Sequence, residues 1–127
     1  MLEKRLYAFR AAICTKDNEE QIIEDVKKIY CSVIEKNGIC PDDIVAIEFT
    51  TTPDITALNP ATALRRSGVD VGSAALFCAL EAVFKGSLPS VIRMMLMAYV
   101  EPKGEGKFSP QNVYLNGAEV LRPDLSK

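Results

Sequence analysis

The chain has 127 residues, nearly half of them apolar, and this is enough for the core of one compact domain but not of two. Its 15 basic and 17 acidic residues almost balance, which argues against a nucleic-acid groove or a polybasic membrane patch, because both need clustered basic residues. There is no histidine, so the commonest general base and zinc ligand are missing. We expect one domain over residues 1–127, with no nucleic-acid or membrane partner.

The cysteines Cys14, Cys31, Cys40 and Cys78 form no C-x-x-C pair. The segment from Met1 to Arg10 is charged and does not resemble a secretory leader, so we expect a cytoplasmic protein with free thiols, most of them buried. No phosphate-binding loop, dinucleotide fingerprint or nucleophile elbow is present in the sequence. We therefore expect no cofactor and no metal.

The first half of the chain predicts a strand, a long helix and a second strand. Leu6 to Cys14 is mixed apolar and is typical of a strand. Asn18 can cap a helix that carries apolar residues at helical spacing and ends at Asn37-Gly38. Ile44 to Thr50 is rich in β-formers and predicts the next strand.

The middle of the chain predicts a second helix, a short apolar segment and a third helical stretch. Asn59 and Pro60 predict the start of a second helix that ends at Gly68. Ala74 to Leu80 is short and apolar, so periodicity does not separate a strand from a helix there. We expect a third helical stretch within Glu81 to Ser87.

The last third predicts a strong strand and a hairpin. Val91 to Val100 is an apolar run that only Arg93 interrupts, and a loop from Glu101 to Pro110 follows it. The turn signal Asn116-Gly117 separates two short β-like runs, Val113-Tyr114-Leu115 and Ala118 to Leu121, and so predicts a hairpin. After the hairpin, the tail from Arg122 to Leu125 leaves the sheet. Strands that alternate with helices indicate an α+β (mixed α/β) domain.

Arg93 is the most informative residue, because a strand as apolar as Val91 to Met97 should be largely buried. A guanidinium stays charged, so burying it without a partner would cost several kcal/mol. It needs an anion, which is either an internal carboxylate, such as Glu81 or Glu48, or a carboxylate on a ligand. The strand alone leaves these two alternatives open.

Arg10 repeats the pattern, as a single fixed cation in the apolar run from Ala8 to Ile13. Two such arginines on different strands suggest a pocket for a molecule with several carboxylates, because the forked guanidinium binds a carboxylate through two hydrogen bonds. The alternative is two separate surface arginines. Glu81, Cys78 and Tyr114 are further candidates, but each is a weak signal by itself.

Several short segments are arranged along the chain in a characteristic order: Arg10-Ala11-Ala12 before an acidic helix start, Thr52-Pro53-Asp54, Pro60-Ala61 with Ala63 and Arg65, Ile92-Arg93-Met94-Met95, Val113-Tyr114-Leu115, and Ala118 with Val120 to Ser126. These segments closely resemble the AroH-type chorismate mutases. The resemblance runs from about Phe9 to Ser126, almost the whole chain, and the ordered spacing makes it more specific than any single motif.

The resemblance implies a single α+β domain with a mixed sheet and helices on one side. It also implies a homotrimeric pseudo-barrel with pockets at the subunit interfaces. The implied activity is the rearrangement of chorismate to prephenate in aromatic amino-acid biosynthesis. This unimolecular pericyclic reaction needs no nucleophile, metal, cofactor or proton shuttle, so a chain without histidine loses nothing.

Carried over residue by residue, the resemblance places Arg93 near the ether oxygen of the breaking bond. Arg10 and Tyr114 would hold the substrate carboxylates. Glu81 and Cys78 would meet the ring hydroxyl. Of these five residues, we expect Arg93, Arg10 and Glu81 to be catalytic.

The resemblance also implies a rim around the pocket. Arg65 would lie at the mouth and attract the dianion, Ala61 would line the pocket, and Leu121 and Arg122 would help close it. The chain departs from the family pattern at three positions of the rim or wall: Thr62 in place of a lysine, Asn59 in place of an aromatic residue, and Phe77 in place of a threonine. We expect these departures to alter substrate affinity and the peripheral contacts and to leave the two central arginines intact.

Two other functions compete with the mutase hypothesis. One is a non-catalytic trimeric module that binds a small carboxylate as a regulatory sensor, using the same arginines. The other is an imine hydrolase of the Rid type, which also uses an arginine and an acid at a subunit interface. Consumption of chorismate distinguishes the mutase from both.

Overall fold

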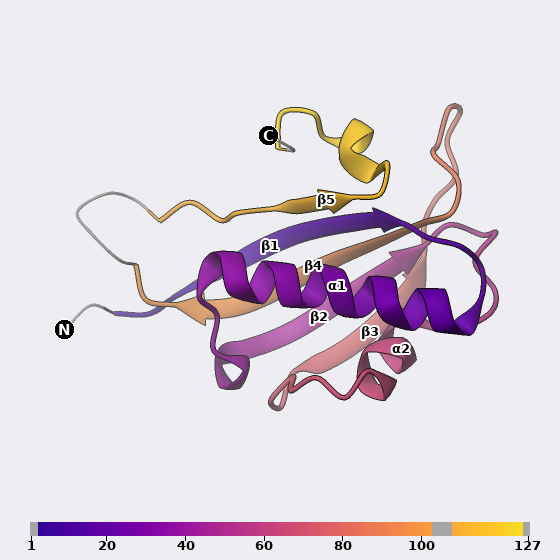
Figure 1. Ribbon diagram of the computed structural model, residues 1–127. Helices are drawn as coiled ribbons and strands as arrows, with labels where there is room; N and C mark the ends of the chain where they lie inside the picture. Colours follow the sequence, from indigo (N-terminus) through magenta and orange to yellow (C-terminus); the bar gives the residue numbers. More distant parts are fainter. Residues whose placement is uncertain (1–2, 103–107, 126–127) are drawn as a thin grey trace.

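The architecture is one mixed sheet with its helices on one side (Figure 1). It is taken from a computed structural model that describes residues 3–102 and 108–125. The elements in chain order are β1 (Arg5–Cys14), α1 (Glu19–Asn37), the 3-10 turn η1 (Pro41–Asp43), β2 (Ile44–Thr51), α2 (Pro60–Arg66), β3 (Ala75–Leu80), β4 (Val91–Val100), β5 (Val113–Leu115) and the 3-10 turn η2 (Ala118–Leu121).

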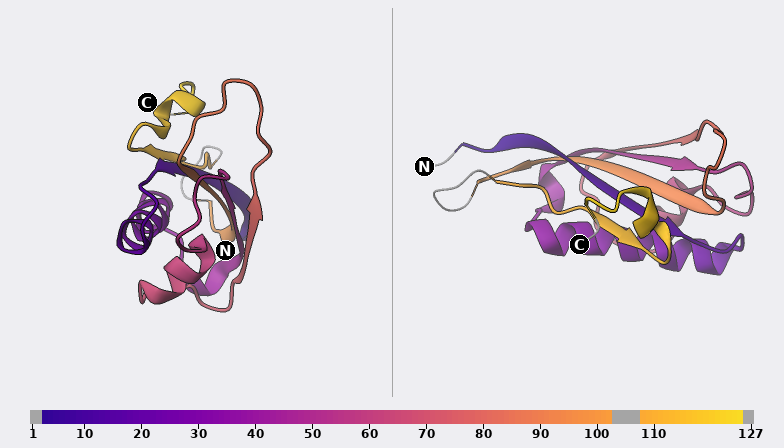
Figure 2. Two further views of the ribbon diagram at one scale, coloured as in Figure 1. Left: turned by 90° about the vertical axis from the view of Figure 1, so that its right-hand side faces the viewer. Right: turned by 90° about the horizontal axis from the view of Figure 1, so that it is seen from above.

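The strands lie in the order β3-β2-β4-β1-β5. The central strand β4 is antiparallel to both β1 and β2, while the edge strands β3 and β5 are parallel to β2 and β1. Both α-helices cover the same face of the sheet (Figure 2). The expected α+β fold, with a mixed sheet and helices on one side, is confirmed.

Helix α1 forms as its sequence predicts. The Asn18 side chain accepts a hydrogen bond of 2.8 Å from the Gln21 N–H, which satisfies one of the free donors at the helix start. Gly38 ends the helix in the left-handed conformation, with φ 62°, which costs glycine little. The apolar stripe of α1 then packs against the sheet.

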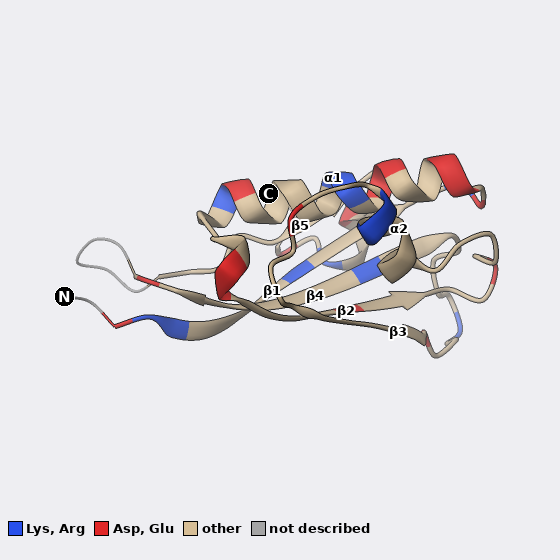
Figure 3. Ribbon diagram, turned by 90° about the horizontal axis from the view of Figure 1, so that it is seen from below, with Lys and Arg blue, Asp and Glu red and all other residues tan. Residues whose placement is uncertain are grey.

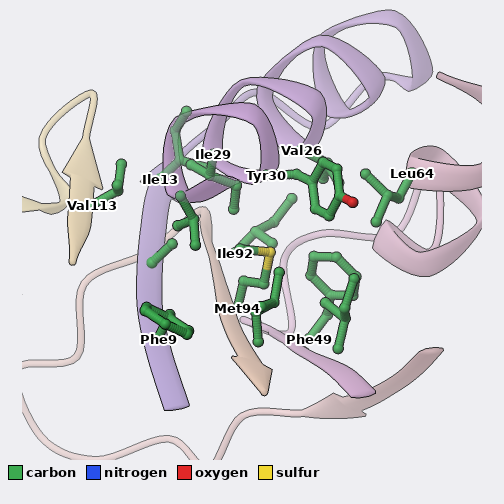
Figure 4. Packing of buried hydrophobic residues seen from close by; sticks show 14 of the residues in the cluster. Phe9, Ile13, Val26, Ile29, Tyr30, Phe49, Leu64, Ile92, Met94 and Val113 are labelled. Atoms are coloured by element: carbon green, nitrogen blue, oxygen red, sulfur yellow. The ribbon is translucent and has the colours of Figure 1, made fainter. Parts of the chain in front are cut away.

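The core lies between the helices and the covered face of the sheet (Figure 4). Side chains alternate along a strand, so Ile92, Met94 and Leu96 of β4 are buried there. Arg93 and Met95 therefore point to the opposite face, on which no α-helix of the described residues packs. We call this opposite side the open face of the sheet.

The other confirmed elements are β1, β2, β4 and α2, with bounds close to those expected. Asn59 caps α2 by accepting a hydrogen bond from the Ala61 N–H at 2.8 Å. The structure also decides the ambiguous segment from Ala74, most of which forms the strand β3. Of the predicted loop from Glu101 to Pro110, residues 103–107 lie outside the described residues, as does Ser126.

The helix expected within Glu81 to Ser87 was wrong, because residues 81–84 have no regular structure and a turn follows. Gly86 is left-handed, with φ 82°, and the Phe84 N–H donates to the Ser87 hydroxyl at 2.9 Å. A segment this short forms a helix only if it packs an apolar face against the core. Instead, Val83 and Phe84 are exposed.

The predicted hairpin was also wrong in its second half. Asn116 and Gly117 do take the positive φ angles of a tight turn, 55° and 99°, but Ala118–Leu121 forms a 3-10 turn and not a strand. β5 pairs with β1 and not with the segment after it. Burial explains the difference, because Ala118 packs in a small second cluster with Ala12.

The cysteines are free, as expected, but the expectation that most are buried was wrong. Three are half-buried and Cys40 is exposed. Within residues 3–102 and 108–125, no helix is long and apolar enough to cross a membrane.

Candidate active site

The two arginines predicted from the sequence lie on neighbouring strands of the open face. In the antiparallel register Arg10 is opposite Met95, and Arg93 is opposite Ala12, so the arginines occupy adjacent levels of the β1–β4 ladder. Figure 3 shows a basic segment on each of these two strands. The alternative of two separate surface arginines is therefore wrong.

A cavity of about 250 Å³ lies over this pair. Its polar lining comes from four strands of the sheet and from the residue after β3: Arg10, Arg93, Glu48, Thr50, Tyr114 and Glu81. We call it the arginine cavity. It brings together four of the sequence-predicted site residues, Arg10, Arg93, Glu81 and Tyr114.

Glu81 is the anion that balances Arg93. The Arg93 Nε lies 2.9 Å from Oε1 and 3.0 Å from Oε2 of Glu81, while the Thr50 hydroxyl donates to Oε1 at 2.9 Å. Within the described residues, neither terminal nitrogen of Arg93 donates to a protein acceptor. The guanidinium is thus oriented by Glu81 and keeps its outer donors for a ligand.

The expectation that Arg93 is largely buried was wrong, since its side chain is 41% exposed. The apolar residues beside it in sequence point to the helix-covered face, and Arg93 points to the open one. Between the internal partners considered, the structure selects Glu81 over Glu48. The ion pair uses only Nε of Arg93, so the two terminal nitrogens can still bind an anionic group of a ligand.

Tyr114 closes the β5 side of the arginine cavity. It is opposite Ala12 in the parallel β1–β5 pair and is 8% exposed, in the same small cluster as Ala118. Leu121 packs half-buried against this cluster. A second hollow of about 370 Å³ adjoins the first, between the loop after β3 and η2, and its lining includes Glu81, Arg93 and Leu121.

Arg122 makes a two-pronged ion pair with Asp124, from Nε to Oδ1 at 3.0 Å and from Nη2 to Oδ2 at 2.7 Å. These hydrogen bonds hold the pKa of Asp124 below its ordinary value, and the charge of Arg10 lowers it further. The charge of Asp124 is thus within the electrostatic influence of Arg10.

The other predicted site residues do not lie in this cavity. Asn59, Ala61, Thr62 and Arg65 belong to the start and body of α2, on the covered side of the sheet. Ala61 is buried there, and Arg65 is exposed.

The last two predicted residues, Cys78 and Phe77, are neighbours on strand β3 and point to opposite faces of the sheet. Cys78 is opposite the buried Phe49 and packs against the main core, so its thiol is on the covered face, where burial raises the thiol pKa. Phe77 points to the open face and is 64% exposed, at the level of Glu48. Within one chain the predicted residues thus form two groups, one on each side of the sheet.

Sequence reasoning missed Thr50, which fixes Glu81, and did not assign Glu48 to the cavity wall. The signal was present in β2, where alternation places Glu48 and Thr50 on the face opposite the apolar Ile47 and Phe49. No group of three or more cysteine, aspartate or glutamate residues in the described part of the chain could hold a metal ion.

Comparison with known proteins gives consistent results. The family model for chorismate mutase type I matches residues 6–125. The chorismate mutase AroH of Bacillus subtilis (strain 168) is 33% identical over 117 residues, covering 91% of this chain and 88% of the relative. The chorismate mutase AroH of Thermus thermophilus is 34% identical over 118 residues, with 91% and 93% covered. The solved structure of a chorismate mutase from Clostridium thermocellum, Cth-682, is 36% identical with a TM-score of 0.76, covering 90% of this chain and 98% of that one.

Proposed function

The chain belongs to the chorismate mutase type I family, and on this premise we propose that the arginine cavity is where it converts chorismate to prephenate. The observation that carries the proposal is the juxtaposition of Arg10 and Arg93 on adjacent strands, with Glu81 orienting one of them. The chain is thus a chorismate mutase, an isomerase of aromatic amino-acid biosynthesis, and the assignment of its residues is our proposal.

The reaction requires a compact substrate conformer and stabilisation of charge as the carbon–oxygen bond breaks. Clamping the two carboxylates supplies the first effect, because it fixes the reacting atoms near each other. A fixed cation beside the developing negative oxygen supplies the second, and such preorganised electrostatic stabilisation is usually the largest single contribution. We assign this cation to Arg93.

The orientation of Arg93 supports its assignment. Nε is held by Glu81, which is itself held by Thr50, so the planar guanidinium starts the reaction already aligned. Preorganised donors avoid the cost of reorientation during the reaction. The outer nitrogens then point their hydrogen bonds toward the ether oxygen of bound chorismate.

Arg10 and Tyr114 are assigned to the substrate carboxylates. Arg10 lies one level along the sheet from Arg93, and Tyr114 lies opposite Ala12, so both groups border the same space. Glu81 reaches this space as well and can accept a hydrogen bond from the ring hydroxyl. Leu121 lines the adjoining hollow together with Glu81 and Arg93. We assign to Leu121 and Arg122 the closing of the site on this side.

The second group of residues leads us to propose a homotrimer in which a neighbouring copy completes each site. Asn59, Ala61, Thr62, Arg65 and Cys78 lie on the covered side of the sheet and cannot contact a ligand in the same chain's arginine cavity. The open face also exposes large apolar side chains outside the cavity: Leu6, Phe77 and Tyr99. Exposed apolar patches of this kind are typical of subunit interfaces.

We also propose that the protein is cytoplasmic.

The assignment of Arg93 is tested by Arg93→Lys, which keeps the charge but loses the fork and its alignment on Glu81. Loss of one preorganised donor costs about 3–4 kcal/mol, so kcat for chorismate should fall by about 10²–10³-fold. The assay follows the loss of chorismate absorbance, and circular dichroism checks that the fold is retained. Near-normal turnover by this variant would show that Arg93 is not the transition-state cation.

A further inference from the structure

Ser90, the residue directly before β4, has a backbone conformation that serine rarely adopts. Its φ is 57°, in the left-handed region, and among the described residues only Asn116 is a second non-glycine residue with a positive φ. A strained residue of this kind persists only where its surroundings hold it, and such residues are concentrated at functional sites. Arg93 follows closely on the same segment, so the contacts that hold Ser90 bear on the position of Arg93.

The carboxylate of Asp54 holds Ser90 from one side. Its Oδ2 accepts hydrogen bonds from the Ser90 N–H at 2.9 Å and from the Ser90 hydroxyl at 3.0 Å. Its Oδ1 accepts a third hydrogen bond from the Thr52 hydroxyl at 2.5 Å. From the other side, the Thr15 N–H at the end of β1 donates to the Ser90 carbonyl at 2.9 Å. We call Asp54, Thr52 and Ser90 the Asp54 clamp.

The Asp54 clamp reaches the backbone of β4 through Thr52, which is buried. The Thr52 hydroxyl accepts a hydrogen bond from the Val91 N–H at 3.0 Å, and the Thr52 N–H donates to the Val91 carbonyl at 3.1 Å. Because side chains alternate along a strand, Val91 and Arg93 point to the same face of the sheet. The clamp therefore fixes the start of the strand that carries Arg93.

Glu81, the partner of Arg93, is attached at the same place. Its N–H donates to the carbonyl of Thr51 at 2.9 Å, and Thr51 directly precedes Thr52. The loop between Glu81 and β4 thus begins and ends on one short segment at the end of β2. A shift of the start of β4 away from this segment would move Arg93 relative to Glu81.

We propose that Asp54 is a positioning residue for Arg93, which holds Ser90 in its left-handed conformation and thereby aligns the start of β4 with Glu81. The inference rests on the proposed function, because it gives the alignment of Arg93 a consequence for turnover. The contacts of the Asp54 clamp are all made within one chain, so they do not require a neighbouring copy. An interaction made only in the transition state affects kcat and leaves KM almost unaltered.

The test measures steady-state turnover of chorismate by Asp54→Ala, which removes the three hydrogen bonds that the carboxylate accepts. Misplacement of catalytic groups by about 1 Å costs about 10²-fold in rate, and the clamp acts on Arg93 indirectly, so we expect kcat to fall about tenfold. The KM should stay within about twofold. Asp54→Asn keeps one acceptor oxygen, so its kcat should fall less, by about threefold, and it provides the test if Asp54→Ala does not fold.

A second substitution at Ser90 separates positioning from a general loss of stability. Glycine adopts a positive φ about as readily as a negative one, so Ser90→Gly removes the strain that Asp54 has to hold. Combined with Asp54→Ala or Asp54→Asn, it should restore kcat to within about threefold of the wild-type value. The hydrogen bond from Thr15 to the backbone of residue 90 remains in these variants.

Asp70→Ala is the matched control. Asp70 also lies in a loop, before β3, where its Oδ1 accepts the Gly72 N–H at 2.8 Å, toward the opposite end of β2 from the partner of Arg93 in the ladder. This variant should lower the melting temperature without lowering kcat. Wild-type kcat in folded Asp54→Ala, or in Asp54→Asn if the former does not fold, would overturn the inference, as would a loss of kcat that Ser90→Gly does not restore. Failure of the wild-type chain to consume chorismate would instead overturn the proposed function.

Discussion

Glu81→Gln tests whether the Arg93–Glu81 ion pair serves catalysis or the stability of the fold. The change keeps the size of the side chain and an oxygen that can accept the Thr50 hydrogen bond, but it removes the charge that holds Arg93 Nε. One of the two carboxylate oxygens becomes an amide N–H₂ group. This group is a donor that faces the Arg93 Nε, and the one remaining oxygen is neutral and shared with Thr50, so the alignment of Arg93 is weakened.

The structure predicts a small effect on stability. The paired side chains are 41% and 25% exposed, and solvent-screened pairs of this kind contribute about 0–1 kcal/mol. A loss of this size is small against a total stability of about 5–15 kcal/mol, so the variant should stay folded. The melting temperature should fall by about 4 °C or less.

The effect on turnover should be much larger. Catalytic groups displaced by about 1 Å can cost about 10²-fold in rate, and we expect a loss of this order in kcat/KM for chorismate. The assay combines steady-state turnover with thermal unfolding of the same preparation. A loss of more than about 3 kcal/mol of stability would assign the pair to the core, since only breaking a buried ion pair is that costly. Unchanged turnover by Glu81→Gln would show that the charge of Glu81 has no role in catalysis.

Asp43→Asn is a matched control. The Asp43 carboxylate forms an ion pair with the Lys4 ammonium at 2.8 Å, remote from the arginine cavity. The Lys4 side chain is 51% exposed and the Asp43 side chain is 24% exposed. Its exposure resembles that of the Arg93–Glu81 pair, so the stability cost of breaking it should be similar. Turnover should be unaffected, and the contrast between the two variants isolates the catalytic contribution.

Two further predictions concern acid stability and assembly. Hydrogen bonds from Thr52 and Ser90 lower the pKa of Asp54 in the folded state. The ionised Asp54 carboxylate therefore stabilises the fold fully above the unfolded pKa of 3.8, and this stabilisation is lost as the pH falls through the folded pKa. Urea unfolding should therefore show Asp54→Asn less stable than wild type at neutral pH, with a gap that narrows below about pH 4; a constant gap would contradict this origin. The proposed homotrimer predicts a mass of three chains in analytical ultracentrifugation, and a monomer that turns over chorismate would refute completion of the site by a neighbouring copy.

Some features of this protein depend on short stretches of sequence and were predicted correctly. Helix α1 is 19 residues long, with its capping residue, apolar stripe and terminal glycine all within one segment. Strand β4 follows from its apolar run, and the position of Arg93 within that run already indicated an unusual charge. These are local properties, because capping, side-chain alternation and backbone preference depend on near neighbours in the chain.

Other features depend on which segments meet, and only the tertiary structure decided them. Strand register placed Arg10 beside Arg93 and put Cys78 on the opposite side of the sheet from the cavity. The choice of Glu81 over Glu48 as the partner of Arg93 followed from the path of the loop after β3.

The two wrong predictions of secondary structure have the same physical cause. Segments 81–87 and 118–121 are too short for local preference to determine their structure, so the available packing surface decides it. Ala118 found such a surface in its cluster with Ala12, whereas Phe84 remained exposed. Local sequence thus determined the long helix, the strands other than β3 and the placement of one arginine in each of two apolar strands, while the packing of strands and loops brought those arginines into one site.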